Sequence, residues 1–111
     1  MADITHWSHA NAGADVALTA DEDWTSGAFD THYGTSVQAF GTSPVPVVLQ
    51  ASADGEHWFN VKRAEPDEEG HFSIIQSDWV ARYARLRVPA EHLDPRDEAP
   101  RITATLLGKT V

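Results

Sequence analysis

Residues 45–61, VPVVLQASADGEHWFNV, decide the fold class that the sequence predicts. Every second residue of its first half is apolar, and the pair Asp54-Gly55 separates this half from a second apolar run. Alternation with a period of two residues is typical of a strand that buries one face, and Asp-Gly supplies the positive φ of a hairpin turn. The stretch therefore predicts two antiparallel strands joined by a tight turn. The expected core-facing residues of the first strand are Val45, Val47, Leu49 and Ala51.

Residues 79–88, WVARYARLRV, predict another strand with two different faces. One face would carry Tyr83, Arg85 and Arg87, and the other Val80, Ala84, Leu86 and Val88. Strands are expected at residues 16–20, 36–41, 45–51, 58–62, 72–76, 80–88 and 102–107, with 24–29 as an additional candidate. Pro44 and Pro46 cannot donate hydrogen bonds to a ladder, so the strand at 45–51 is expected to begin at a sheet edge.

The chain of 111 residues is expected to form one domain. Clusters of Gly, Pro, Asp and Asn separate the expected strands, as an all-β sandwich requires. The predicted fold is a single antiparallel β-sandwich, of jelly-roll or galactose-binding-like type, over residues 16–111. Residues 1–15 show no clear element and are expected to form an extended N-terminal arm.

Charge and composition exclude several classes of partner. The formal net charge is −9, and all eight lysine and arginine residues lie in residues 61–111. Phosphate and anionic membrane surfaces need compensating cations, so no nucleic-acid or membrane partner is expected. No apolar run approaches the roughly 18–20 residues of a membrane span, and residues 1–10 do not look like a signal peptide. Cysteine is absent, which excludes disulfides, thiolate metal sites and cysteine nucleophiles.

Reaction chemistry is not visible in the sequence. There is no Gly-x-Ser-x-Gly elbow, and the six histidines are scattered, whereas a zinc site needs several converging ligands. The acidic runs 21–23 and 65–69 lack the Asp-x-Asp-x-Asp-Gly loop, so solvated faces are expected, with a structural calcium as the alternative. We therefore expect no catalytic residues, no cofactor and no metal. A carboxylate pair for glycoside cleavage stays open, because the fold can bring distant carboxylates together.

Trp7 is the expected intermolecular contact of the arm. Together with Ile4, His6 and His9 it places apolar and aromatic groups on a segment that has no core of its own. Tryptophan often anchors protein interfaces, and the alternative is that Trp7 folds back onto its own domain. Two further tryptophans, Trp58 and Trp79, flank expected strands and are expected to fill space within the sandwich.

The basic cluster Arg82, Arg85 and Arg87 is the second candidate contact. One interpretation is pairing with carboxylates across the sheet, which is usual on an exposed face. The other is contact with an acidic patch of a neighbouring subunit, such as residues 65–69. The sequence leaves both open.

Two motifs resemble known protein families. Residues 49–58, LQASADGEHW, together with residues 81–86, ARYARL, resemble the signature of discoidin-like, galactose-binding-like β-sandwiches. More closely, the stretch from about residue 24 to residue 111 resembles small bacteriophage virion proteins encoded among head genes. The matching pieces are residues 40–41, 48–58, 82–88 and 103–107. These are framework positions, so no ligand-binding loop carries over.

The phage resemblance implies a structural virion protein that decorates or cements a capsid by bridging shell subunits. Its implied partners are the phage major capsid protein and further copies of the chain, as a homotrimer. It would be assembled in the bacterial cytoplasm and lie on the capsid exterior, where specific bridging needs roughly 800 Å² per partner. The alternatives are a carbohydrate-binding module, a phage tail or baseplate component, and a small metal-dependent enzyme.

Overall fold

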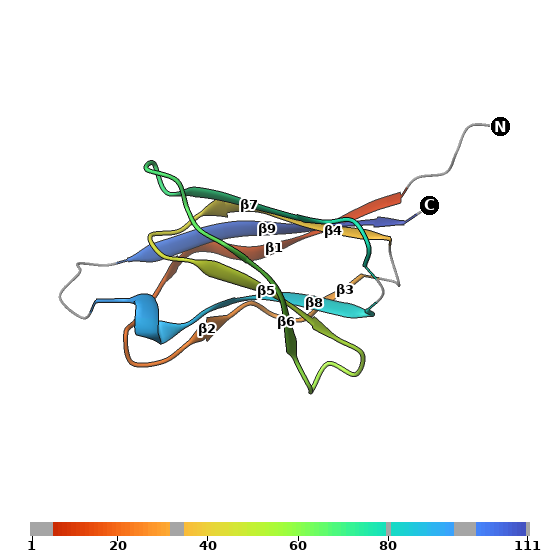
Figure 1. Cartoon of the computed structure of the whole chain (residues 1–111), viewed down its shortest axis with the longest axis horizontal. Coiled ribbons are helices and arrows are strands. Elements are labelled where there is room, and N and C mark those ends of the chain that lie inside the picture. The colour runs from red at the N-terminus through yellow and green to blue at the C-terminus, as the bar shows by residue number, and fades with distance from the viewer. Residues whose placement is uncertain (1–5, 32–34, 80, 95–99, 111) are drawn as a thin grey trace.

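The computed structural model describes residues 6–31, 35–79, 81–94 and 100–110, with side chains described between residues 16 and 108 of these ranges. Two antiparallel sheets pack face to face, which confirms the predicted all-β sandwich (Figure 1). The four-stranded sheet contains, in spatial order, β1 (His6–Ala17), β9 (Arg101–Thr110), β4 (Ser36–Thr42) and β7 (His71–Gln76). The five-stranded sheet contains β2 (Trp24–Thr25), β8 (Tyr83–Val88), β5 (Val47–Ser52) and β6 (Phe59–Ala64), and β3 (Phe29–Asp30) also pairs with β8.

Helical structure in the described ranges is confined to the short turn η1 (Ala90–His92). No helix among these residues has the length and apolar character that crossing a membrane requires.

The core lies between the sheets and follows the predicted alternation. On β8, Ala84, Leu86 and Val88 are fully buried, whereas the residues between them are partly exposed on the outer face. The four-stranded sheet contributes side chains that are at most 1% exposed, namely Val37, Ala39, Ile74, Ile102, Ala104 and Leu106. Trp79 joins this core and donates its indole N–H to the Ala81 carbonyl at 2.6 Å, so it fills space as expected.

The N-terminal segment differs from the expected arm. Residues 6–17 form β1, whose backbone pairs along β9 from His6 opposite Thr110 to Ala17 opposite Arg101. Register shifts near Gly13 interrupt the ladder, and such irregularities remove the period-two pattern by which a strand is found in a sequence. The expected boundary at residue 15 therefore falls inside a strand of the sandwich.

β5 is an interior strand, contrary to the expectation from its two prolines. It pairs with β8 on one side and β6 on the other, and its first residue is Val47. Pro44 and Pro46 precede the ladder, where a missing N–H group removes no sheet hydrogen bond. The β5–β6 connection is also longer than a tight turn, because residues 53–58 separate the strands, although Gly55 has the expected positive φ of 80°.

Gly41→Ala should destabilise the fold strongly. A Cβ at Gly41 of β4 would lie 1.9 Å from the Thr103 carbonyl oxygen and 2.8 Å from the Ala104 Cα, both in β9. These are backbone atoms of a paired strand, so the sheet itself would have to move. We expect the free energy of unfolding to fall by about 3 kcal/mol, as for severe overpacking, in urea-unfolding measurements.

Gly27→Ala is the matched control for that change. No atom lies within 4 Å of a Cβ built at Gly27, so its effect should stay within about 0.5 kcal/mol. Equal losses for the two variants would contradict the close approach of β4 to β9.

Candidate functional site

A row of polar side chains crosses the outer face of the five-stranded sheet. The strand registers place Gln50 opposite Arg85 on one side and opposite Asn60 on the other. Arg85 Nε donates to Gln50 Oε1 at 2.7 Å, and Gln50 Nε2 donates to Asn60 Oδ1 at 2.8 Å. The Arg85 guanidinium also lies over the Trp58 ring, 4.2 Å from its centroid. We call these four residues the platform.

The strands that build the core also build the platform. Leu49 of β5 lies opposite Leu86 of β8, and both are fully buried between the sheets. Successive side chains of a strand point to opposite faces, so the neighbouring Gln50 and Arg85 point outward. Gln50 is only 5% exposed, and a buried amide is stable only when it is hydrogen-bonded, as it is here by Arg85 and Asn60. The platform is therefore held in one geometry before any ligand arrives.

A shallow hollow extends the platform toward η1. It has a volume of about 280 Å³, and its lining includes Val48, Asn60, Arg63, Arg87 and His92. Arg87 is ion-paired with Asp23, and the other Asp23 oxygen accepts the Ala90 N–H at 2.8 Å. The hydrogen bonds from Ala90 and Arg87 lower the pKa of Asp23, so this carboxylate stays ionised and holds the start of η1 against β8.

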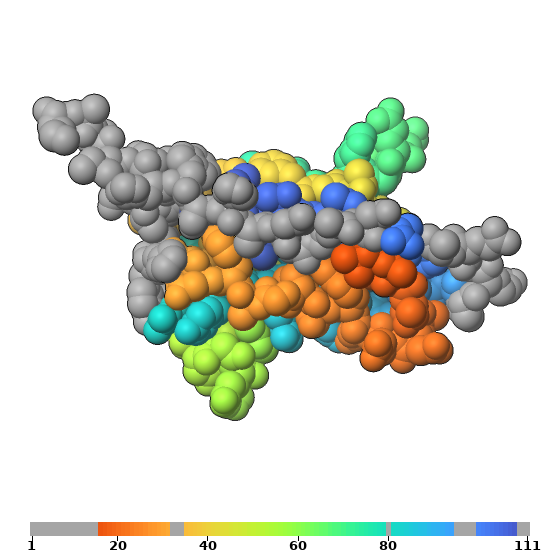
Figure 2. Space-filling view, turned by 180° about the vertical axis from the view of Figure 1, so that it is seen from behind, coloured from red at the N-terminus to blue at the C-terminus, as the bar shows by residue number. Residues whose placement is uncertain are grey.

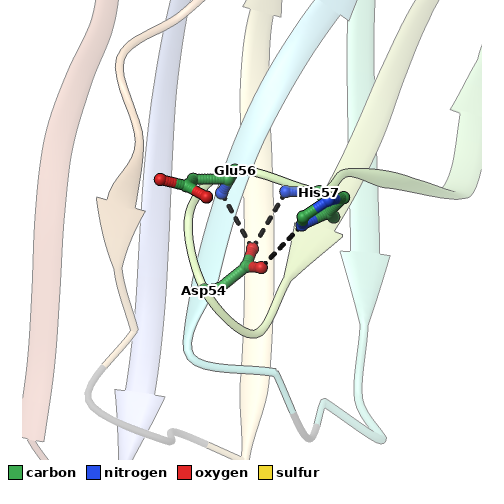
Figure 3. Close-up of side chains that lie close together, drawn as sticks. All are labelled: Asp54, Glu56 and His57. Carbon is green, nitrogen blue, oxygen red and sulfur yellow. Dashed lines mark hydrogen bonds and ion pairs between the residues drawn. The ribbon is translucent and has the colours of Figure 1, made fainter.

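The loop of residues 53–58 is held by one carboxylate. Asp54 Oδ1 accepts the backbone N–H groups of Glu56 at 2.8 Å and His57 at 2.9 Å, and Asp54 Oδ2 lies 2.7 Å from His57 Nδ1 (Figure 3). Hydrogen bonds from His57, and then from Glu56, hold the pKa of Asp54 well below its usual range. Figure 2 shows this loop as the yellow-green lobe at the lower edge of the molecule, away from the green lobe of residues 65–70.

The same loop brings metal-ligand types together. Asp54, Glu56 and His57 each offer one ligand atom within 4.8 Å of the others, and all three residues are exposed. Both Asp54 oxygens already accept hydrogen bonds that close the loop, and Glu56 and His57 extend in opposite directions (Figure 3). Loop closure therefore accounts for the cluster without an ion.

In the acidic run 65–69, one carboxylate is also held by local hydrogen bonds. Asp67 Oδ1 accepts the backbone N–H groups of Glu69 and His71, each at 2.9 Å. The His71 hydrogen bond is the largest cause of the lowered pKa of Asp67. This carboxylate, like Asp23 in the other run, therefore forms local structure.

The predicted arginine cluster lies at β8, but its members have different partners. Arg85 and Arg87 lie on the outer face, and Arg82 immediately precedes the strand. Arg82 Nη2 lies 3.3 Å from Asp30 Oδ2, so Arg82 and Arg87 both pair with carboxylates of neighbouring strands or loops. Arg85 contacts only neutral groups among the described residues.

The predicted N-terminal contacts belong to the other sheet. His6, Trp7 and His9 lie in β1, opposite Thr110, Lys109 and Leu107 of β9. Ile4 lies outside the described residues. The structure therefore does not bring this group together with the arginines of β8.

Sequence reasoning did not identify Gln50 and Asn60 as members of a site, and it wrongly expected Trp58, which lies on the outer face beside Arg85, to fill space within the sandwich. The one available signal was Gln50, a large polar residue inside the apolar run VVLQAS. Such a residue needs buried partners, but the sequence does not say which strands supply them.

Comparison with known proteins supports the fold class. No protein-family model matches the chain, and no curated protein matches it significantly. A solved family 29 carbohydrate-binding module is similar with a TM-score of 0.53 and 14% identity, over 97% of this chain and 90% of that one. A mutant of CBM29-2, from work on ligand recognition by this family, gives the same score and identity over 97% and 87% of the two chains. The fold is thus the β-sandwich found in carbohydrate-binding modules.

Asp54→Asn should lower stability and change its dependence on acid. Because the folded-state pKa of Asp54 lies below the ordinary value of 3.8, its charge stabilises the fold above that pH, and this contribution is lost as the pH falls through the folded-state value. We expect the wild type to exceed the variant in melting temperature at about pH 7, with the difference shrinking below about pH 4. Thermal unfolding across this range measures both.

Glu56→Gln is the control in the same loop, since the Glu56 side chain accepts no hydrogen bond from the described residues. A constant difference between wild type and Asp54→Asn from pH 7 into acid would contradict the role of the Asp54 charge.

Proposed function

We propose that the chain is a non-catalytic binding module that takes a carbohydrate on the platform. The observation that carries this proposal is the Trp58–Arg85–Gln50–Asn60 chain, in which an aromatic ring, a guanidinium and two amides are fixed on the outer sheet face. Amide and guanidinium groups hydrogen-bond sugar hydroxyls, while aromatic rings pack against the apolar C–H faces of sugars. Their fixed geometry reduces the entropy lost on binding.

Among the described residues, the platform is a better candidate for the functional site than the one cluster that resembles a catalytic centre. Ser52, Asp54 and His57 are the residue types of a hydrolase triad and lie close together. However, Ser52 Oγ donates to Asp54 Oδ1 at 3.0 Å, and His57 contacts the other oxygen of the same carboxylate. In a catalytic triad the serine hydroxyl is hydrogen-bonded to the histidine. These three residues instead close the loop and do not activate a nucleophile.

The two similar solved structures also favour this proposal. Both are carbohydrate-binding modules, and each matches nearly the whole of this chain. At 14% identity the similarity concerns the backbone, so the choice of ligand depends on this chain's own side chains.

Trp58→Ala should weaken glycan binding at least tenfold, about 1.4 kcal/mol, because it removes the ring that supports Arg85. Polysaccharides that retain the protein in an immobilised panel would be identified first, and their affinities measured by calorimetry. Phe40→Ala is the matched control, since Phe40 is a 38% exposed aromatic residue on the other sheet. The proposal would be wrong if the wild type retained no glycan, or if Trp58→Ala bound the glycan as tightly as the wild type.

A structural role in a virion, which the phage resemblance implies, is the second proposal, and β1 is the strand through which it would act. β1 is paired only with β9 among the described strands, so one backbone edge is open to another chain. This strand holds the predicted contacts His6, Trp7 and His9. Attachment to shell subunits through β1 would agree with capsid decoration by a trimer, or with a tail or baseplate position.

Co-sedimentation with capsid shells tests the virion proposal. Saturable binding at a fixed ratio to the major capsid protein is the expected outcome for decoration, whereas a few copies per particle would favour a tail position. Absence from purified particles would rule out both.

A further inference from the structure

Arg85 differs from the other arginines whose contacts are described. Arg63, Arg82 and Arg87 each contact a carboxylate, those of Glu65, Asp30 and Asp23 respectively. Arg85 contacts the neutral amide oxygen of Gln50 and the ring of Trp58, and no carboxylate among the described residues. In a chain of net charge −9, a guanidinium without a carboxylate partner requires an explanation.

The donors of Arg85 that remain are those on its outer edge. Its Nε is used by Gln50, and one face of its plane is used by Trp58. The two Nη groups find no acceptor among the described residues, although together they carry four N–H donors. Gln50 cannot rotate away, because its own amide nitrogen is bound by Asn60 at 2.8 Å. The guanidinium is therefore fixed, with its paired donors unused.

The surroundings favour an anion at these donors. Partial burial is the main cause of a lowered Arg85 pKa, and the nearby Arg87 charge adds to it. Both effects make the cation less stable than it is in water, and the opposite charge of a bound anion would offset them. The neighbouring hollow of about 280 Å³, whose charged lining residues are Lys62, Arg63 and Arg87 together with Glu91, leaves space for the rest of the ligand.

We propose that the two Nη groups of Arg85 bind a carboxylate of the ligand in bidentate fashion, so that the glycan is an acidic polysaccharide containing uronic acids. This inference rests on the proposed carbohydrate-binding function and names its substrate class. The planar guanidinium fork matches a carboxylate through two parallel N–H···O hydrogen bonds, which neutral hydroxyls do not reproduce. Asn60, which is exposed, then lies where a hydroxyl of the same or the next sugar would bind, while the buried Gln50 holds Arg85 and Asn60 in place.

An acidic peptide fits this site less well than a glycan. Arg85 and Gln50 lie on the strands β8 and β5, each of which is paired with a strand on both sides. Their backbone groups are used within the sheet, so an extended peptide would find no ladder to join. A glycan carries its polar groups as hydroxyls and carboxylates, which the platform side chains meet directly.

The first test changes only the ligand. Polygalacturonate, polymannuronate and hyaluronan are each compared with their carboxyl-reduced forms by calorimetry, with the full chain. We expect at least one native polymer to bind and its reduced form to bind at least tenfold more weakly. Equal binding of the two forms would overturn the acidic-glycan inference and leave the carbohydrate proposal standing. If neither form of any polymer binds, and no neutral glycan binds either, both proposals fail.

The second test replaces the planar guanidinium of Arg85 and keeps its positive charge. Arg85→Lys should lower affinity for the native polymer about tenfold and affinity for the reduced polymer by a smaller factor, so that the ratio of the two affinities falls toward one. Arg101→Gln is the control, because it removes a positive charge from an exposed residue of the other sheet. If Arg85→Lys lowers the affinities for both polymers by the same factor, Arg85 only supports the other platform residues, and the inference is overturned. Polyglutamate that binds as tightly as the polysaccharide would overturn the glycan assignment.

Discussion

The register between β5 and β8 links the hydrophobic core to the outer face of the sheet. Leu49 opposite Leu86 is fully buried, and Gln50 opposite Arg85 is the next pair along the ladder. A slip of one residue would place Arg85 between the sheets and the leucines in water, and a buried unpaired charge costs several kcal/mol or more. Burial of aliphatic side chains therefore also determines the geometry of the platform, although no platform residue belongs to the core.

The net charge of −9 does not describe the electrostatic surroundings of a single binding site such as the platform. Three of the seventeen acidic residues form local structure: Asp54 and Asp67 close loops, and Asp23 holds Arg87 and the start of η1. At physiological salt, exposed charges farther away than about 8 Å are largely screened. A ligand on the platform therefore meets mainly Arg85 and its neighbours, and an acidic chain can hold a cationic site.

Sequence patterning predicted the strands in which core and surface residues alternate, such as β4, β5 and β8. It failed where pairing does not depend on side-chain alternation: β1 is irregular along β9, and the expected strand at 24–29 is two short strands, β2 and β3. The β5–β6 loop is longer than the tight turn that Asp54-Gly55 predicted. The side-chain contacts of Asp54 that close it cannot be read from the sequence pattern. The platform could not be predicted, because Gln50 and Arg85 are 35 residues apart and meet only through strand order.

The two proposed functions use opposite sheets and do not compete for the same surface. β1 lies at an edge of the four-stranded sheet, whereas the platform lies on the outer face of the five-stranded sheet. A chain attached to a particle through β1 would keep Arg85 and Trp58 open to solvent, and a glycan on the platform would leave β1 free to pair. Glycan binding by itself therefore does not argue against a virion role, and association with particles does not argue against a glycan. The two properties are independent because a β-sandwich has two outer surfaces that share only the core between them.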